Sequence, residues 1–145
     1  MLTWSLDPQL ARDTVALGDL PLSRVLLMND ANYPWLILVP RRPALVEIID
    51  LEENEQVQLM AEVARAAQVL KAATACDKLN IAAIGNVVAQ LHVHIVARRR
   101  GDTAWPLMGS LGTLSTTSVA KRRSGNDDRG AGRHCRYEGR HTSCA

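Results

Sequence analysis

The chain has 145 residues, of which 47% are hydrophobic and 22% charged, so it can form one globular domain with its own core and is unlike a disordered or fibrous sequence. Its formal net charge of +2 is uneven, because residues 107–145 carry seven Lys or Arg against three Asp or Glu. Residues 1–106 are therefore mildly acidic, which argues against a nucleic-acid-binding surface on them.

The N-terminal part of the chain predicts a short helix followed by three strands. Asp7 is the expected cap of a helix that has Pro8 at its first position. Turn-forming residues at 18–21 and 29–34 separate the apolar, β-prone runs that follow. The expected strands are residues 14–17, 23–28 and 35–39.

A long amphipathic helix is predicted to begin at Asp50. Glu53 stands three residues later, which is the arrangement of a capping box. An apolar stripe with helical spacing continues to about Ala73, and it predicts a helix that covers one face of a sheet. The stripe consists of Val57, Met60, Val63, Ala64, Ala67 and Leu70, and the polar face of Glu55, Gln58, Glu62, Arg65 and Lys71.

Two further strands follow the helix. Residues 79–84 form an apolar run that ends at the turn pair Gly85-Asn86, and another run is expected from Gln90 to about Arg99. Strands, one long helix and again strands predict an α+β domain with a mainly antiparallel sheet over residues 1–106.

The cysteines and the N-terminal residues indicate in which cellular compartment the protein is expected. The three cysteines show no metal-ligand spacing and no disulfide framework, which is usual in a reducing compartment. The first residues contain no basic segment and no long apolar run, so neither a signal peptide nor a membrane-spanning helix is expected. We therefore expect a cytoplasmic protein with no membrane and no nucleic-acid partner.

The segment Gln90-Leu91-His92-Val93-His94 points most directly to function, because it holds two of the four histidines of the chain. Alternate side chains of an extended strand share a face, so Gln90, His92 and His94 are predicted to form a row on one face. Two imidazoles at this spacing can be a nucleophile and its partner at a phosphorus centre, two metal ligands, or inert polar residues on a solvated face. The pattern alone leaves these three alternatives open.

Two segments together resemble the histidine triad (HIT) superfamily of nucleotidyl hydrolases and transferases. Residues 85–96 (GNVVAQLHVHIV) are similar to its histidine strand, and residues 28–42 (MNDANYPWLILVPRR) to its asparagine loop, the next strand and a Val-Pro-basic segment. The similarity is greatest to a bacterial subgroup with Gln-Leu-His-Val-His in place of the full triad. The resemblance covers roughly residues 10–106 and implies the HIT fold, with a homodimer formed through the sheet.

The resemblance implies a role for each residue of the row. His92 matches the central histidine, which attacks the α-phosphate and forms a covalent nucleotidyl-imidazole, and His94 matches the third histidine, which helps with the phosphate and, if protonated, stabilises its oxygens. A neutral imidazole is a good nucleophile near pH 7 if an acceptor holds its other N–H. Gln90 matches the first histidine, and its amide can donate to a phosphate oxygen but cannot shuttle a proton.

Three further residues are candidate substrate contacts. The resemblance places Asn29 near the ribose hydroxyls and Asn86 near the phosphates, and Arg98 is a candidate for attracting an anionic substrate. The alternatives are a turn-forming role for each asparagine and a solvated strand end for the arginine. This scheme needs neither a metal nor a cofactor.

The resemblance thus implies a nucleotidyl hydrolase or transferase that acts through His92 on a purine nucleotide conjugate, of the phosphoramidate or dinucleoside polyphosphate type. The alternative is a nucleotide-binding protein of HIT fold with little or no catalysis, because Gln90 replaces a histidine. A metalloenzyme is the third alternative, and it lacks an evident third ligand.

If the chain is a nucleotidyl hydrolase or transferase, Gln90→His should raise or preserve activity. A large loss of activity would instead show that the amide has a positioning role.

Residues 107–145 differ in character from the rest of the chain. They are rich in Gly, Ser, Thr and Arg without a sustained hydrophobic period, so composition predicts a disordered or weakly structured basic tail. In the subgroup, Trp-Pro leads into an ordered segment of Pro-Val-Trp-Gly character, whereas here Leu107-Met108-Gly109-Ser110 follows. A frame change in the coding sequence near codon 107 would explain the difference, and a genuine divergent tail is the alternative.

We predict that residues from about 110 to 145 contribute little to stability, because they offer almost no apolar surface to bury and much chain entropy to lose. Limited proteolysis should cut first at Lys121, Arg122 or Arg123 and leave a resistant fragment that ends near residue 110. A chain truncated at residue 110 should melt within a few degrees of the full chain. If the truncated chain unfolds or loses its dimer, the tail is an integrated element instead.

Overall fold

The computed structural model describes residues 3–106, so the predictions about residues 107–145 lie outside the described part. Its five-stranded sheet is antiparallel throughout, in the order β1-β2-β3-β5-β4. The predicted α+β architecture is confirmed. The strands are β1 (Thr14–Asp19), β2 (Ser23–Met28), β3 (Trp35–Pro40), β4 (Lys78–Ala83) and β5 (Val93–Arg98), and the helices are α1 (Pro8–Asp13), the 3₁₀ helix η1 (Ile48–Asp50) and α2 (Glu53–Thr74).

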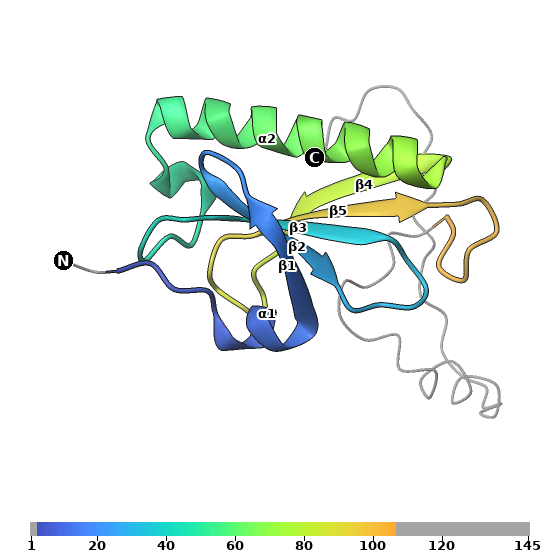
Figure 1. Cartoon of the computed structure of the whole chain (residues 1–145), viewed down its shortest axis with the longest axis horizontal. Coiled ribbons are helices and arrows are strands. Elements are labelled where there is room, and N and C mark those ends of the chain that lie inside the picture. Colours follow the sequence, from blue (N-terminus) through green and yellow to red (C-terminus); the bar gives the residue numbers. More distant parts are fainter. Residues whose placement is uncertain (1–2, 107–145) are drawn as a thin grey trace, which may run out of the picture. The chain divides into compact units, whose positions relative to one another are not determined.

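Different parts of the chain cover the two faces of the sheet (Figure 1). α2 packs on one face, over β3 and β5, and α1 lies on the other. All six residues of β3 are buried, which agrees with its unbroken apolar sequence and its cover on both faces. The core under α2 is aliphatic; it includes Leu36, Leu38, Val93 and Ile95 from the sheet and Leu59, Val63 and Leu70 from the helix. Within residues 3–106, no helix is long and apolar enough to cross a membrane.

The predicted start and buried face of the long helix need correction. The capping box lies at η1, between Glu47 and Asp50, and α2 begins at Glu53 without a side-chain cap. Val57 and Met60, which we expected in the core, are exposed. Val63, Ala67 and Leu70 are buried as predicted, and the other buried residues of α2 are Leu59, Glu62 and Ala66. This helix carries apolar residues on two faces, so its periodicity alone does not decide which face the sheet covers.

The bounds of two strands also differ from the prediction. β1 continues through the expected turn residue Gly18, with a bulge between Ala16 and Gly18. Gly18 has a φ of 153°, a backbone angle that residues with a side chain rarely adopt. β5 begins at Val93, so residues 90–92 precede the ladder and are not part of it.

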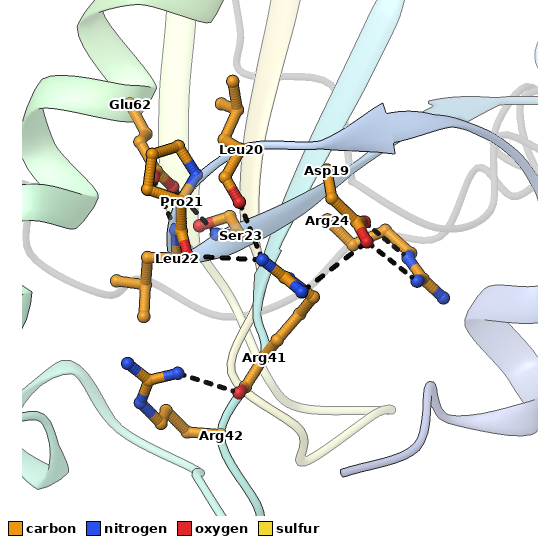
Figure 2. A network of polar contacts seen from close by, with 9 residues as sticks. All are labelled: Asp19, Leu20, Pro21, Leu22, Ser23, Arg24, Arg41, Arg42 and Glu62. Atoms are coloured by element: carbon orange, nitrogen blue, oxygen red, sulfur yellow. Dashed lines mark hydrogen bonds and ion pairs between the residues drawn. The ribbon is translucent and has the colours of Figure 1, made fainter.

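Glu62, which we expected on the polar face of the helix, is buried beneath the turn between β1 and β2 (Figure 2). Its carboxylate accepts hydrogen bonds from the backbone N–H groups of Leu22 (2.7 Å) and Ser23 (2.9 Å) and from Nε2 of Gln58 (3.0 Å). Burial raises the pKa of this carboxyl, but the hydrogen bonds to its charged form prevail and the pKa is lowered. Glu62 thereby ties α2 to the β1–β2 turn.

Two arginines hold the same turn from its other side (Figure 2). Arg41 donates to the carbonyl oxygens of Leu20 (2.9 Å) and Pro21 (3.2 Å). Arg24 donates to Asp19 over 2.8 Å, and this hydrogen bond is the main reason why the pKa of the Asp19 carboxyl is lowered. The turn is therefore fixed both to the helix and to the end of β3, where Arg41 follows Pro40.

Glu62→Ala should lower the free energy of unfolding by about 2–4 kcal/mol, because two buried N–H groups lose their acceptor. The folded pKa of Glu62 lies below its ordinary value of 4.5, so its contribution is present above that pH and is lost as the pH falls through the folded pKa. Urea unfolding near pH 7 and near pH 3 measures both effects, and the variant should lose less stability on acidification than the wild type.

Gln68→Ala is the matched control for this variant, because Gln68 is an exposed residue of the same helix. It should change stability by less than about 0.5 kcal/mol. If Glu62→Ala were as stable as Gln68→Ala, the proposed tie between helix and turn would be refuted.

Candidate functional site

The register of β5 sets the position of the histidines. His94 lies opposite Ile37 of β3 and Ala82 of β4. Its neighbours Val93 and Ile95 pack under α2, so His94 is on the face turned away from that helix. The ring of His92 stands edge-on to that of His94, with a centroid separation of 4.6 Å and an interplanar angle of 79°. The two imidazoles are therefore side by side, as strand alternation predicts.

His92 is held in one tautomer by the backbone. Its Nδ1 lies 2.6 Å from the carbonyl oxygen of Gln90, and the side chain is only 5% exposed. A carbonyl can only accept, so Nδ1 carries the proton and, in the neutral ring, Nε2 carries the free lone pair. This carbonyl is the acceptor that a nucleophilic imidazole requires.

His94 is held in the opposite tautomer. The indole Nε1–H of Trp35 donates to Nδ1 of His94 over 3.1 Å, so Nδ1 is unprotonated and Nε2 carries the proton. Burial, together with the charge of His92, lowers the pKa of His94 to about 4, although a backbone hydrogen bond with Ile84 opposes the shift. The condition for a cationic His94 is therefore not met near neutral pH, and the neutral ring keeps its one N–H on Nε2.

Trp35 is a residue of this site that the sequence analysis did not single out. Its ring lies 5.3 Å from that of His94, between centroids, and is 7% exposed. A buried indole N–H needs an acceptor, so a tryptophan that opens an otherwise apolar strand is a usable indication of a polar partner across the sheet.

The Gln90 side chain contacts another part of the chain. Its Oε1 accepts from the backbone N–H of Asp7 (2.9 Å), and its Nε2 donates to the carbonyl oxygen of Ser5 (2.8 Å). Both partners belong to the segment that leads into α1. The amide is thus engaged at both ends, and its donation to a phosphate oxygen stays a prediction.

A cleft of about 110 Å³ opens beside His92. It lies between the loop that precedes η1, with Val46 and Glu47, and the segment that leads into β5. Three of the predicted site residues line it, and they are Asn86, Gln90 and His92. The Asn86 side chain is exposed, so it is accessible to a molecule in the cleft.

Arg98 is buried in a hydrogen-bond network at the end of β5, and its contact with a substrate stays a prediction. It is 3% exposed, and its guanidinium donates to both carboxylate oxygens of Asp102, each at 2.7 Å, and to Oδ1 of Asn80 at 2.9 Å. It also lies 5.3 Å from the ring centroid of Tyr33. The hydrogen bond from Arg98 is the main reason why the pKa of Asp102 is lowered. Arg98 thereby joins the end of β5 to β4 and to the next loop.

Asn29 lies at the end of β2, where its backbone N–H donates to the carbonyl oxygen of Asp13 over 2.9 Å. Its side chain is exposed and does not line the cleft beside His92. The contact of Asn29 with a ribose stays a prediction.

Comparisons with known proteins agree on one family. A sequence model of the HIT domain matches residues 9–101. A solved histidine triad protein from Bradyrhizobium japonicum is 59% identical, with a TM-score of 0.72 over 81% of this chain and 91% of its own. A histidine triad protein from Sinorhizobium meliloti is 46% identical, with a TM-score of 0.73 over 77% of this chain and 83% of its own. One from Marinobacter aquaeolei is 38% identical, with a TM-score of 0.72 over 81% of this chain and 89% of its own. A comparison with curated proteins gave no match.

His94 should stay neutral until the pH approaches about 4 in an NMR titration of its ring. Because this folded pKa lies below the ordinary value of 6.5, stability should be full above that pH and fall as the pH drops towards 4, since only the unfolded chain takes up the proton. Trp35→Phe removes the donor to Nδ1 and should raise the pKa of His94.

Trp105→Phe is the control for Trp35→Phe, because it also removes an indole but lies in the turn after β5, where Trp105 is 38% exposed. It should leave the titration of His94 unchanged. A wild-type His94 that titrates near 6.5 would contradict the geometry of the pair.

Proposed function

The chain belongs to the histidine triad (HIT) family, and on that premise we propose that it is a nucleotidyl hydrolase or transferase with His92 as its nucleophile. The observation that carries the proposal is the hydrogen bond between Nδ1 of His92 and the carbonyl of Gln90. It leaves Nε2 as the nucleophilic atom of a ring that borders a cleft. Neither an inert surface histidine nor a randomly oriented one needs this arrangement.

The proposed reaction has two steps. Nε2 of His92 forms a bond to the α-phosphorus, and the bond to the leaving group breaks; the leaving group keeps the electron pair and, where it is an amine, takes up a proton from solvent. The ring gains positive charge in this step, and the Gln90 carbonyl stabilises it by accepting the Nδ1–H. Water or another acceptor then attacks the phosphorus and loses a proton to solvent. The imidazole leaves with the electron pair of the broken bond, returns to its neutral form, and the nucleotide is released.

The charge of the cleft favours one class of leaving group. Among its lining residues Glu47 carries a carboxylate, and there is no Lys or Arg. A polyphosphate leaving group would meet this negative charge without a compensating cation, whereas an amine would not be repelled. We therefore favour a purine nucleotide phosphoramidate over a dinucleoside polyphosphate, with Asn86 as the contact to the phosphate.

The exposed side of α2 supports the proposed homodimer. Met60 is 66% exposed and lies on the opposite side of the helix from Glu62, which faces the β1–β2 turn. Met60 therefore faces the β4 side, where Ile81 of the edge strand is 47% exposed. An edge strand beside an apolar helix face is suited to pair with a second copy of itself.

His92→Ala should lower the turnover of adenosine 5′-phosphoramidate by about 10³-fold or more, because the covalent step loses its nucleophile. With a slow substrate, mass spectrometry of the wild type should show one nucleotidyl adduct, on His92. The turnover assay is repeated with a dinucleoside polyphosphate and with adenylyl sulfate as substrates, and all assays are run with EDTA present.

Arg99→Ala is the control for this variant, since Arg99 is an exposed residue at the end of the same strand, and its turnover should match the wild type. An adduct on His94, or full activity of His92→Ala, would reject the assignment. Nucleotide binding without turnover would favour the binding protein, and loss of turnover in EDTA would favour the metalloenzyme.

A further inference from the structure

We propose that Gln90 is a positioning residue, which latches the N-terminal segment of residues 3–7 to the loop that carries His92 and so fixes the nucleophile. This inference rests on the proposed function, in which His92 attacks the phosphate. Gln90 binds in two directions, because its side chain holds Ser5 and Asp7 while its carbonyl holds His92. The same residue thus connects the first residues of the domain to the reacting ring.

The latch is a paired hydrogen bond to the backbone. Asp7 donates to Oε1 over 2.9 Å, and Nε2 donates to Ser5 over 2.8 Å, so both ends of the amide are used. With its acceptor and its donor both engaged, the side chain cannot rotate without breaking a bond, each worth about 0.5–1.5 kcal/mol. The Cα of Gln90 is therefore held in place by the N-terminal segment.

The N-terminal segment is itself fixed. The guanidinium of Arg24 stacks on the ring of Trp4 at 4.9 Å from the centroid. Asp7 caps α1 by accepting the N–H of Gln9 over 2.7 Å, and Leu10 of α1 is buried. Figure 1 shows α1 and the loop that leads into β5 on the same side of the sheet. The latch therefore joins His92 to an anchored element rather than to a free end.

The loop before β5 needs such a support. His92 precedes Val93, the first residue of the β5 ladder, so no strand pairing holds the peptide between Gln90 and Leu91. On one side this peptide is held by the N–H of Leu91, which donates to Leu45 over 2.9 Å. The side chain of Gln90 holds its other end, and the carbonyl that faces Nδ1 of His92 lies between these two supports.

This role changes the expectation for Gln90→His. An imidazole carries its donor and its acceptor on different sides of a ring, whereas the amide presents both at the end of a flexible chain. A histidine at this position cannot bind Ser5 and Asp7 in the way that the amide does. We therefore expect Gln90→His to lower the turnover, contrary to the expectation from the sequence.

Two variants break the latch from its two sides. Gln90→Met keeps the length of the side chain and removes both hydrogen bonds. Asp7→Pro removes the N–H at the other end together with the capping carboxylate, and the φ of −55° at Asp7 is already compatible with proline. Asp7→Ala is the matched control, because it loses the same capping carboxylate and keeps the N–H.

With adenosine 5′-phosphoramidate as the probe, Gln90→Met and Asp7→Pro should each lower kcat by about 10- to 100-fold with little change in KM. Asp7→Ala, which loses the cap of α1 but keeps the N–H that binds Gln90, should lose much less kcat than Asp7→Pro. The double variant Gln90→Met/Asp7→Pro should be no slower than Gln90→Met alone, because the two changes remove the same link. An equal loss of kcat in Asp7→Ala and Asp7→Pro, or an unchanged kcat in Gln90→Met, would overturn the proposal.

A second measurement does not depend on activity. Nitrogen-15 NMR should show the Nδ1–H tautomer of His92 in the wild type and in Asp7→Ala, and a mixture of both tautomers in Gln90→Met and Asp7→Pro. An unchanged tautomer in both latch variants would overturn the proposal. If the wild type turns over none of the conjugates, the proposed function fails, and the tautomer comparison still decides on the latch.

Discussion

The imidazoles of His92 and His94 are buried side by side on the face of the sheet turned away from α2. Because a buried polar atom needs a hydrogen-bond partner, the Nδ1 of each ring requires one. His92 meets a carbonyl, which accepts, and His94 meets an indole, which donates. The two rings therefore take opposite tautomers. This requirement places the protons of two chemically identical side chains differently: in the neutral rings, Nε2 carries a lone pair in His92 and a proton in His94.

The sheet supplies the partner of His94, because β5 lies next to β3 and Trp35 belongs to β3, whereas the partner of His92 belongs to the loop before β5. Val93 and Ile95 complete the core under α2, which leaves the alternate positions of β5 for the opposite face. On β3, Trp35 stands two residues before Ile37, the cross-strand neighbour of His94, so its ring reaches His94 on the diagonal.

Two buried charges of the domain, Glu62 and Arg98, connect parts of the fold. Glu62 holds the β1–β2 turn against α2, and Arg98 joins β5 to Asp102 and Asn80. Each of them is buried with its hydrogen-bond partners, as a charge in a protein interior must be. The proposed chemistry therefore relies on neutral donors and acceptors beside His92, chiefly the carbonyl of Gln90 and the amide of Asn86.

The sequence by itself determined the α+β class, the approximate position of every strand, and the pairing of His92 with His94, because these follow from local periodicity. It determined the buried face of α2 only in part, because Val63, Ala67 and Leu70 are buried as predicted but Val57 and Met60 are exposed, and only contact with the sheet selects among the apolar positions. It did not determine the partners of the polar residues. Gln90 binds a segment 83 residues away and Trp35 reaches a histidine 59 residues away, and such contacts depend on how the strands are ordered in space. The tautomers of the two histidines follow from those contacts, so only the tertiary structure decided them.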